Sequence, residues 1–318
     1  MGERRSTMPE SLSYEGFRSV ILSQMEKRFD GDSDISEVYI RETVKNNDKV
    51  RDTLIVHSER NRCMPCLHID DLYNMYETEN VSIDSMVDSI SEFFYSYSQG
   101  QQAVPGGLKD MILDFDCMGP LIECRLVNGE TNRHRLKGMP HKRIGEFALT
   151  YQARTGEARH GYYMMQIDER LMQEWGVDEE ELHETAVRNM DLEHNFVFRH
   201  MDELMGMSLG SNMFVLTSRS KINGATVIIS EEVRRKVSSY MGGDYYILPS
   251  SIHELIIIAA DRAPSPECLA DMVREVNRTK YVSPEEFLSD NVYEYIAEMD
   301  VVVKVGGNMA PLPSLGVS

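Results

Sequence analysis

Two cysteines, Cys63 and Cys66, stand three positions apart in the segment RNRCMPCLHIDD. A Cys-x-x-Cys pair at the start of a helix is typical of thiol–disulfide enzymes, because that position lowers the pKa of the first thiol. With His68 the pair could also bind zinc, although a fourth ligand at the usual spacing is missing. A predicted hairpin precedes the segment, whereas a thioredoxin-like motif belongs to a β-α-β unit. We therefore favour a structural connection shaped by Pro65, and we predict no metal site.

A second group of reactive residue types lies between two apolar runs, in LPSSIHELIII. Ser250 or Ser251, together with His253 and Glu254, is a candidate for nucleophilic catalysis. The segment matches neither GxSxG nor HExxH, and the spacing of Ser251 and Glu254 fits a capping box. One helical turn between two strands is therefore the simpler expectation. The loop, with Pro249, stays a candidate contact for a ligand or partner, since loops on rigid scaffolds often carry function.

The segment GMPHKRIGE is locally basic. His141, Lys142 and Arg143 could bind an anion or the acidic surface of a partner, but a solvated loop is the simpler prediction. No glycine-rich phosphate loop occurs, because VPGGLKD lacks the GK[ST] ending and MGGD follows a predicted helix. We predict no catalytic residue and no cofactor.

The composition is that of an acidic globular protein. Of the 318 residues, 42% are hydrophobic and 27% are charged, which suits a chain with a sizeable core. The 33 Lys and Arg against 52 Asp and Glu give a net charge of −19, which disfavours nucleic acid and anionic membranes as partners. No apolar run approaches the roughly 20 residues needed to cross a bilayer, no secretory signal is visible, and the five cysteines do not suggest a disulfide framework. We expect a cytoplasmic protein.

Hairpins interleave with helices along the chain, which predicts an α+β fold with mostly antiparallel sheets. Ser13 is expected to cap the first helix, and Asp178 a later one. In the last third, capping and periodicity predict three helices, at EEVRRKVSSYM, SPECLADMVREVNRT and SPEEFLSDNVYEY. Apolar runs there predict four strands, at NMFVLTS, GATVIIS, DYYILP and ELIIIAA.

We expect one or two sub-domains. The proposed division is a flexible N-terminus over 1–12, an α+β part over 13–100, a larger α+β part over 101–300, and a tail over 301–318 whose segment GGNMAPLPSLGVS should be loose.

Several phrases resemble one uncharacterised family: YETENVSIDSMVDSI, RLVNGETNRHRLKGMPHKRIGEFALTYQ, WGVDEEELHETAVRNM, NMFVLTSRSKINGATVII, GGDYYILPSSIHELIII and LADMVREVNRTKYVSPEEFLSDNVYEY. They make the chain similar, from about Tyr14 to Tyr295, to the bacterial domain-of-unknown-function family 5688. It is also distantly similar to the YtpQ-like proteins, another uncharacterised group. The resemblance implies a shared fold and supplies no catalytic residues. It further implies that Pro65 is a family feature, whereas Cys63 and Cys66 are not.

Three functional hypotheses follow. The first is a non-catalytic interaction or regulatory module that binds another protein, because no catalytic motif is intact and paired hairpins offer edges and faces. The alternative is a hydrolase or a thiol oxidoreductase that uses the residues named above. The third is an acidic mimic of nucleic acid.

Overall fold

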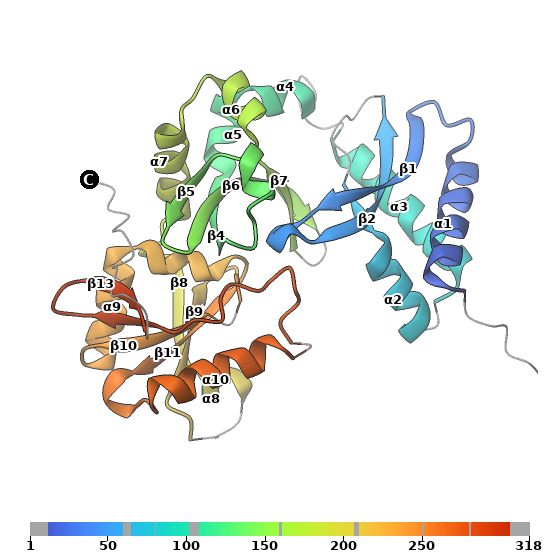
Figure 1. Cartoon of the computed structure of the whole chain (residues 1–318). Helices are drawn as coiled ribbons and strands as arrows, with labels where there is room; N and C mark the ends of the chain where they lie inside the picture. Colours follow the sequence, from blue (N-terminus) through green and yellow to red (C-terminus); the bar gives the residue numbers. More distant parts are fainter. Residues whose placement is uncertain are drawn as a thin grey trace, which may run out of the picture. The chain divides into compact units, whose positions relative to one another are not determined.

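The computed structural model describes residues 12–59, 65–79, 81–101, 108–158, 161–206, 210–249, 251–279 and 281–305 (Figure 1). The chain divides into two compact units. The first runs to Asp114 but excludes Lys45–Lys49, and the second contains those five residues and the chain from Phe115 onward. Every strand pair in the described residues is antiparallel, so the predicted α+β class is confirmed.

The first unit is a three-stranded sheet with helices packed on it, in the strand order β1-β2-β3. Its core joins one face of the first helix to alternate residues of the second strand, as with Phe17 and Ile21 against Leu54 and Val56. The elements are α1 (Tyr14–Phe29), β1 (Ile35–Val44), β2 (Val50–Ser58), β3 (Leu67–His68), α2 (Ile69–Glu79), α3 (Ile83–Gln101) and α4 (Leu108–Leu113).

The first helix begins where the sequence predicts. The Ser13 hydroxyl accepts a hydrogen bond from the Gly16 N–H, which satisfies one of the free donors of the first turn. Phe17, Ile21 and Met25 are fully buried, and their spacing of four residues places them on one face of the helix. The same spacing of apolar residues predicts this helix from the sequence.

The second unit contains a six-stranded sheet and a four-stranded sheet. The six-stranded sheet has the order β13-β12-β10-β11-β9-β8, and in the other β6 pairs with β4, β5 and β7. The elements are the 3-10 helices η1 (Asn46–Asp48), η2 (Gly119–Leu121), η3 (Arg135–Gly138), η4 (Gly224–Ile229) and η5 (Ala260–Arg262), the helices α5 (Phe115–Met118), α6 (Glu169–Trp175), α7 (Glu179–Met190), α8 (Met201–Met205), α9 (Glu231–Met241) and α10 (Pro266–Asn277), and the strands β4 (Ile122–Asn128), β5 (His141–Ile144), β6 (Phe147–Ala158), β7 (Gly161–Gln166), β8 (Phe196–His200), β9 (Met213–Ser218), β10 (Tyr245–Pro249), β11 (Glu254–Ala259), β12 (Tyr293–Ile296) and β13 (Val301–Lys304).

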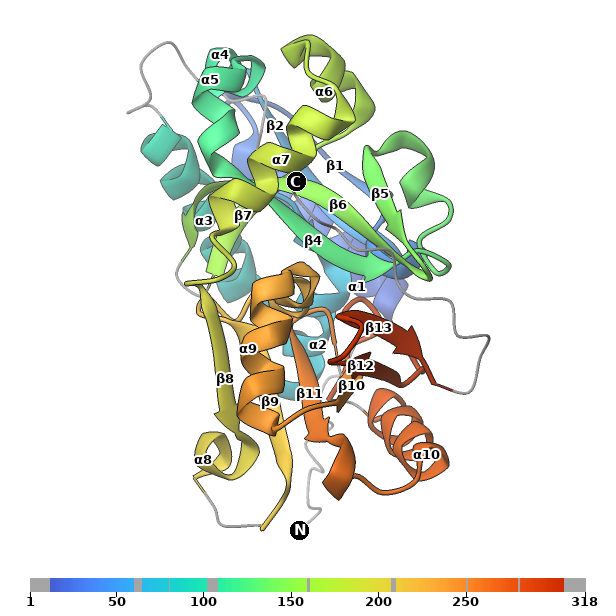
Figure 2. The same cartoon turned by 90° about the vertical axis from the view of Figure 1, so that its left-hand side faces the viewer.

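The two faces of the six-stranded sheet carry different helices (Figure 2). Ile257 packs in the large core with Val233 of α9, whereas its neighbour Ile258 packs with Leu269 of α10. Adjacent residues of a strand point to opposite faces, so α9 and α10 cover opposite sides. The side under α9 also faces the four-stranded sheet, because Leu126 of β4 belongs to the same core.

The predicted strand GATVIIS is instead the 3-10 helix η4. The prediction was wrong because both neighbouring positions beside β9 are occupied, by β8 and β11. The segment lies between the two sheets, where the Leu126 N–H donates to the Thr226 hydroxyl (3.0 Å) and the Ala225 N–H donates to the Ile252 carbonyl (3.1 Å). Its apolar run reflects burial between layers rather than membership of a sheet.

The predicted helix SPEEFLSDNVYEY is also absent, and turns and β12 take its place. One half of the capping box forms, since the Ser283 N–H donates to the Glu286 carboxylate (3.4 Å). The next turn does not follow, because the carbonyls of Pro284 and Phe287 accept hydrogen bonds from the side-chain amide of Asn47 (2.8 and 2.9 Å). Tertiary contacts therefore override a strong local helix signal.

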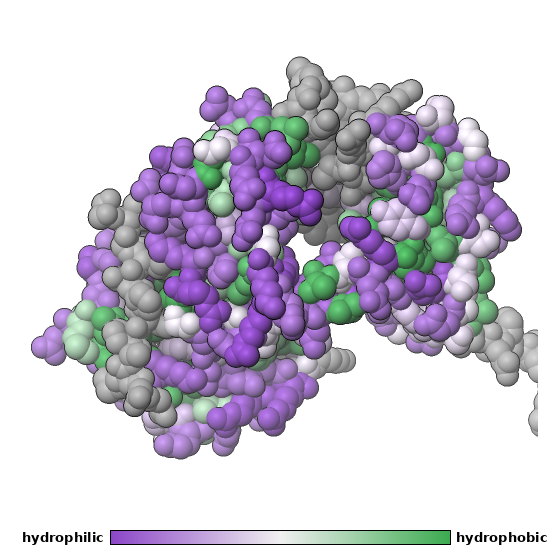
Figure 3. All heavy atoms as spheres, turned by 45° about the horizontal axis from the view of Figure 1, so that its top comes forward, coloured by the Kyte–Doolittle hydropathy of each residue, from purple (hydrophilic) through white to green (hydrophobic). Residues whose placement is uncertain are grey.

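The ends of the chain differ from the proposed division. Val301–Lys304, which we assigned to the tail, form the edge strand β13. The predicted loose segment after it and most of the predicted flexible N-terminus lie outside the described residues. No helix in the described part of the chain is long and apolar enough to cross a membrane. Among the coloured residues of the face drawn in Figure 3, hydrophilic side chains predominate and apolar ones form separate groups.

Candidate functional site

The serine, histidine and glutamate of the β10–β11 connection do not assemble into a catalytic group. The Ser251 hydroxyl accepts a hydrogen bond from the His253 backbone N–H (3.0 Å), and the Ser251 N–H donates to the Glu254 carbonyl (3.4 Å). Ile252 and His253 form bends rather than the expected helical turn. Burial raises the pKa of the Glu254 carboxyl. Ser250 lies outside the described residues, and Pro249 ends β10 and lines an apolar pocket.

The His253 ring is held from both sides. The Asn223 backbone N–H donates to Nδ1 (3.0 Å), and Nε2 lies 3.5 Å from the Glu286 carboxylate. Because Nδ1 accepts, the proton of the neutral ring is on Nε2 and faces Glu286. Burial lowers the pKa of His253, against the opposing effect of Glu286. The ring thus fixes two loops, and no hydroxyl of a described residue is within hydrogen-bond distance of it.

The basic segment at residues 141–143 is part of strand β5, so the prediction of a loop was wrong. His141 Nδ1 contacts the Met139 carbonyl (2.8 Å), Lys142 lies 3.6 Å from Glu180, and Arg143 donates to Glu130 (2.7 Å). His141 and Arg143 border a shallow hollow together with Gly129, Glu130, Arg133, Leu136 and Lys137. Two of the three basic side chains are paired with carboxylates, which weakens the case for an anion site.

Cys66 is an exposed free thiol just before β3. Cys63 lies outside the described residues. His68 is a residue of β3 whose Nδ1 contacts the Thr53 hydroxyl (3.2 Å). The segment from Cys66 leads through this two-residue strand directly into α2.

Asn128, at the end of β4, binds a loop that is 160 residues away in the sequence. Its Oδ1 accepts from the N–H groups of Glu130 and Thr131 (2.9 and 3.0 Å), which closes a turn at residues 128–131. Its Nδ2 donates to the Leu288 carbonyl (2.9 Å). Nearby, Glu130 accepts from Arg133 and Arg143, and these hydrogen bonds lower its pKa. An asparagine–glycine pair is typical of a turn, but nothing in the sequence indicates which loop Asn128 binds.

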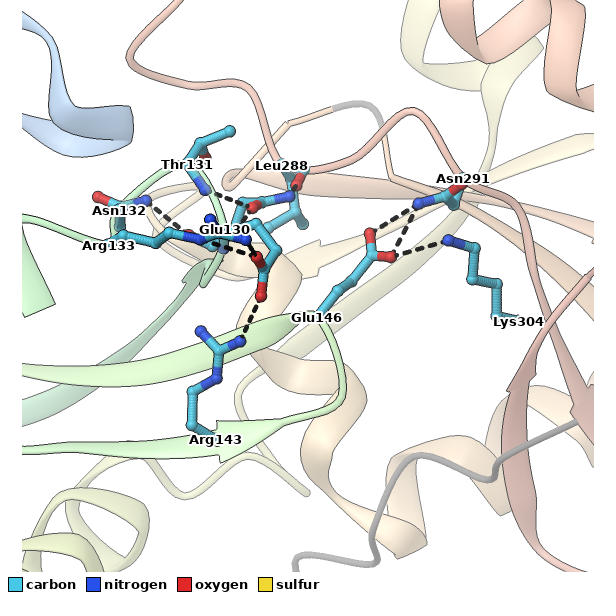
Figure 4. Close-up of polar contacts among 10 residues, drawn as sticks. Glu130, Thr131, Asn132, Arg133, Arg143, Glu146, Leu288, Asn291 and Lys304 are labelled. Carbon is cyan, nitrogen blue, oxygen red and sulfur yellow. Dashed lines mark hydrogen bonds and ion pairs between the residues drawn. The ribbon is translucent and has the colours of Figure 1, made fainter. Parts of the chain in front are cut away.

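Glu146, in the turn between β5 and β6, joins the same loop to the edge strand β13 (Figure 4). Its carboxylate accepts from Asn291 Nδ2 (3.0 and 2.8 Å) and contacts Lys304 Nζ (3.2 Å). Burial alone would raise the pKa of Glu146, but hydrogen bonds from Ser289, Tyr293 and Asn291 and the charge of Lys304 outweigh it, so the pKa is lowered. This arrangement stabilises the ionised carboxylate and holds three segments together.

Glu146→Gln is expected to lower the free energy of unfolding at pH 7 by about 1.5–3 kcal/mol, the usual contribution of hydrogen bonds to a charged group. A carboxyl with a lowered folded-state pKa stabilises the fold above its unfolded pKa of about 4.3, and loses this effect as pH falls through the folded value. The difference between wild type and variant should therefore shrink below about pH 4. Denaturant unfolding measured from pH 7 to pH 3 gives this difference.

Glu130→Gln is the control. Glu130 is exposed and its ion pairs are screened, so this substitution should have a much smaller effect on stability. A difference for Glu146→Gln that stays constant with pH would contradict the assignment.

Strand β8 is a second feature that the sequence prediction missed, and it forms one edge of the six-stranded sheet. The Arg219 N–H donates to the Asn195 carbonyl (3.0 Å). This bond shows that the backbone groups of Asn195, and hence of every second residue after it in β8, point toward β9. Because successive residues of an antiparallel strand point their backbone groups in opposite directions, those of Phe196, Phe198 and His200 point away from β9. No described strand pairs with that side of β8, and at its end the His200 carbonyl begins helix α8, whose N-cap residue is His200. The run NFVFRH does carry aromatic and β-branched residues, but three apolar positions are too few to distinguish a strand.

An aromatic cluster lies on the sheet face next to this edge. We define it as Phe198, Phe214, Tyr240 and His200. The rings of Phe198 and Phe214 stack with centroids 5.1 Å apart, and Tyr240 of α9 meets both edge-on at 5.4 and 5.5 Å. His200 contacts Phe214 at 4.9 Å. Tyr240 is 68% exposed, so the cluster reaches the surface beside the open strand.

The sequence model of a family described as a family of unknown function, DUF5688, matches residues 14–297. The chain belongs to this family. The resemblance seen in the sequence is thus confirmed, and the matched range includes β8, the aromatic cluster, Asn128 and Glu146. No curated protein and no solved structure matches the chain.

Proposed function

We propose that this protein is a non-catalytic interaction module of the cytoplasm, and that it binds another protein through the free edge of β8. The observation that carries the proposal is a strand edge with no partner strand among the described residues, beside an exposed aromatic cluster. An extended segment of the partner would add to the sheet as a further strand. In this mode of recognition the backbone hydrogen bonds give affinity, and contacts of alternate side chains give specificity.

The edge of β8 carries only one of the usual protections against pairing, the charged side chain of Arg199. Native edge strands are commonly blocked by proline, by lysine or by a bulge. Residues 196–200 contain neither proline nor lysine, and their register with β9 is regular. By contrast, the pairing of the edge strand β7 with β6 shifts register between Arg154 and Gly156. Among these two edges, β8 is the better template for a partner strand.

The side chains around β8 suggest the chemistry of the partner segment. On the face of the aromatic cluster, an added strand would place apolar side chains against Phe198 and Tyr240. On the opposite face Arg199 is exposed and makes no ion pair with a described residue. An acidic residue of the partner would complement it. The net charge of −19 makes nucleic acid and anionic membranes poor alternatives.

Among the described residues, no observation favours the hydrolase alternative. Ser251 and Glu254 do not contact the His253 ring, and the Glu286 carboxylate and the Asn223 amide occupy its two nitrogens. We therefore retain the interaction module as the one proposed function.

Affinity capture of the tagged full chain from its native cells tests the proposal. Tyr240→Glu places a charge in the aromatic cluster, at a side chain exposed enough to spare the fold. Tyr281→Glu is the matched control, because Tyr281 is a 79% exposed tyrosine of the same unit outside the cluster. We expect a reproducible partner whose recovery falls at least tenfold with Tyr240→Glu, a loss of about 1.4 kcal/mol in affinity, and stays unchanged with Tyr281→Glu.

Two results would count against the proposal. One is the absence of any reproducible partner, and the other is a partner retained equally by both variants. Recovery of a second copy of this chain, dependent on Tyr240, would instead identify the added strand as β8 of another protomer.

A further inference from the structure

A hollow opens on the surface of the second unit, beside the loop that binds Asn47. Its volume is about 520 Å³, within the range of roughly 300–1,000 Å³ that is usual for small-molecule sites. The wall is formed by Asn47 and Lys49, by Thr131, by residues 277–279 at the end of α10, and by residues of the segment 282–287. All of them belong to the same unit.

Hydrogen bonds fix the wall of this hollow in place. Asn47 Nδ2 donates to the carbonyls of Pro284 and Phe287 (2.8 and 2.9 Å). At the end of α10, Asn277 Nδ2 donates to the Ser289 carbonyl (2.8 Å). Segments that are distant in the sequence are thus held around one hollow, as in a pre-formed ligand site.

Two cations line the hollow without a counter-ion among the described residues. Lys49 and Arg278 are both exposed, so a ligand can reach them, and neither makes an ion pair with a described residue. No carboxylate of a described residue lines the hollow. The neighbouring Glu286 accepts from the Ser283 N–H and lies 3.5 Å from His253. In a chain with a net charge of −19, this hollow is a local reversal of the charge.

The other side chains of the wall limit the kind of anion. Val282 is 8% exposed, Phe287 is partly buried, and both add apolar surface beside the cations. A suitable ligand therefore has an anionic head and an apolar part. A phosphate monoester, with a charge of about −1.5 to −2 at pH 7, balances two cations better than a carboxylate with its single charge. Arginine and lysine are also the usual phosphate-binding side chains.

We propose that this hollow binds a small organic phosphate monoester. The phosphate lies between Lys49 and Arg278, within reach of the Ser283 hydroxyl at the same wall. The organic part packs on Val282 and Phe287. The site is separate from the β8 edge, and the proposal does not depend on a partner protein.

Isothermal titration of the full chain with phenyl phosphate, inorganic phosphate and benzoate tests the proposal. Phenyl phosphate has both parts, inorganic phosphate lacks the ring, and benzoate keeps the ring but carries one charge. We expect one phenyl phosphate per chain, bound at least about tenfold more tightly than either of the other two probes. The net charge of −19 disfavours non-specific uptake of an anion. Absence of saturable phenyl phosphate binding, or equally tight binding of inorganic phosphate or benzoate, would overturn the proposal.

Lys49→Met and Arg278→Met locate the site. Both side chains are exposed, so the fold should be spared, and each substitution should weaken phenyl phosphate binding by about tenfold. Arg262→Met is the matched control, because Arg262 is an exposed arginine of the same unit that does not line the hollow. It changes the net charge by the same amount and should leave binding unchanged. An equal loss in all three variants would indicate a general effect of charge, and unchanged binding in all three would place the anion elsewhere. Either result would contradict the proposal.

Discussion

Asn47→Ala is expected to lower the free energy of unfolding of the second unit by about 3–5 kcal/mol, the range of broken buried hydrogen-bond networks. Asn47 is 8% exposed, and its Nδ2 donates to the Pro284 and Phe287 carbonyls. Its Oδ1 accepts from the Thr131 hydroxyl (2.6 Å) and from Asn132 Nδ2 (3.1 Å). Alanine would leave these buried partners unsatisfied. It would also have to adopt the positive φ of 60° that asparagine tolerates.

Denaturant unfolding followed by tryptophan fluorescence measures this effect, because the single tryptophan, Trp175, is in α6 of the second unit. Asn47→Gly separates the two contributions, since glycine accepts the positive φ but makes no side-chain hydrogen bonds. We expect it to recover about 1–2 kcal/mol relative to alanine and to remain less stable than wild type. Glycine and alanine variants both as stable as wild type would show that the network contributes nothing.

Gly224→Ala is expected to lower the free energy of unfolding of the same unit by about 3 kcal/mol, at the upper end of overpacking effects. A Cβ at this position would lie 2.0 Å from Thr217 Oγ1, 2.4 Å from the His253 carbonyl oxygen and 2.6 Å from the Ser218 nitrogen. Two of these neighbours are backbone atoms, of Ser218 in β9 and of His253 just before β11, and cannot yield by a rotamer change. The backbone of η4 would have to move away from β9.

Gly138→Ala is the matched control for this substitution. Gly138 belongs to the 3-10 helix η3 in the same unit, and a Cβ there would meet nothing within 4 Å. We expect its stability to match or slightly exceed that of wild type, because alanine reduces the freedom of the unfolded chain. Equal stabilities of the Gly224→Ala and Gly138→Ala proteins would contradict the close approach of η4 to the sheet.

The helices were predictable where local signals and tertiary packing agree. Asp178 accepts from the Glu181 N–H (2.9 Å), as expected for a cap, and α10 begins at Pro266 after the cap Ser265. Helix α9, predicted at EEVRRKVSSYM, ends at Gly242, whose φ of 86° is typical of a glycine after a helix. Each of these signals acts within a few residues, so the sequence carries it in full.

The two wrong predictions, the helix SPEEFLSDNVYEY and the strand GATVIIS, share a physical cause. In both segments, contacts with residues distant in the sequence override the local preference. At residues 283–288 the backbone carbonyls accept from Asn47 and Asn128, which lie more than 100 residues earlier. At η4 the run of apolar residues is what a buried strand would show, but a segment buried between two sheets shows the same run. No periodicity in a single segment reports which partner will lie against it.

The sequence predicted that strand edges would be available for a partner, but it did not predict which strand provides one. Paired hairpins indicated available edges, but the strand β8 itself was missed, and the aromatic cluster joins β8, β9 and α9 across more than 40 residues. The residues that seemed to offer chemistry, Ser251 and His253, are used instead to hold a tight connection between strands.

Amide hydrogen exchange along β8, in the free protein and in the complex with the captured partner, tests the central claim most directly. In the free protein the N–H groups of Phe196, Phe198 and His200 should exchange rapidly, while those of Val197 and Arg199, which face β9, should be protected. On binding, the three outward amides should become protected by about tenfold or more, as expected when a partner strand accepts from them. If the partner binds and these three amides continue to exchange as in the free protein, the β8 edge is not the docking surface.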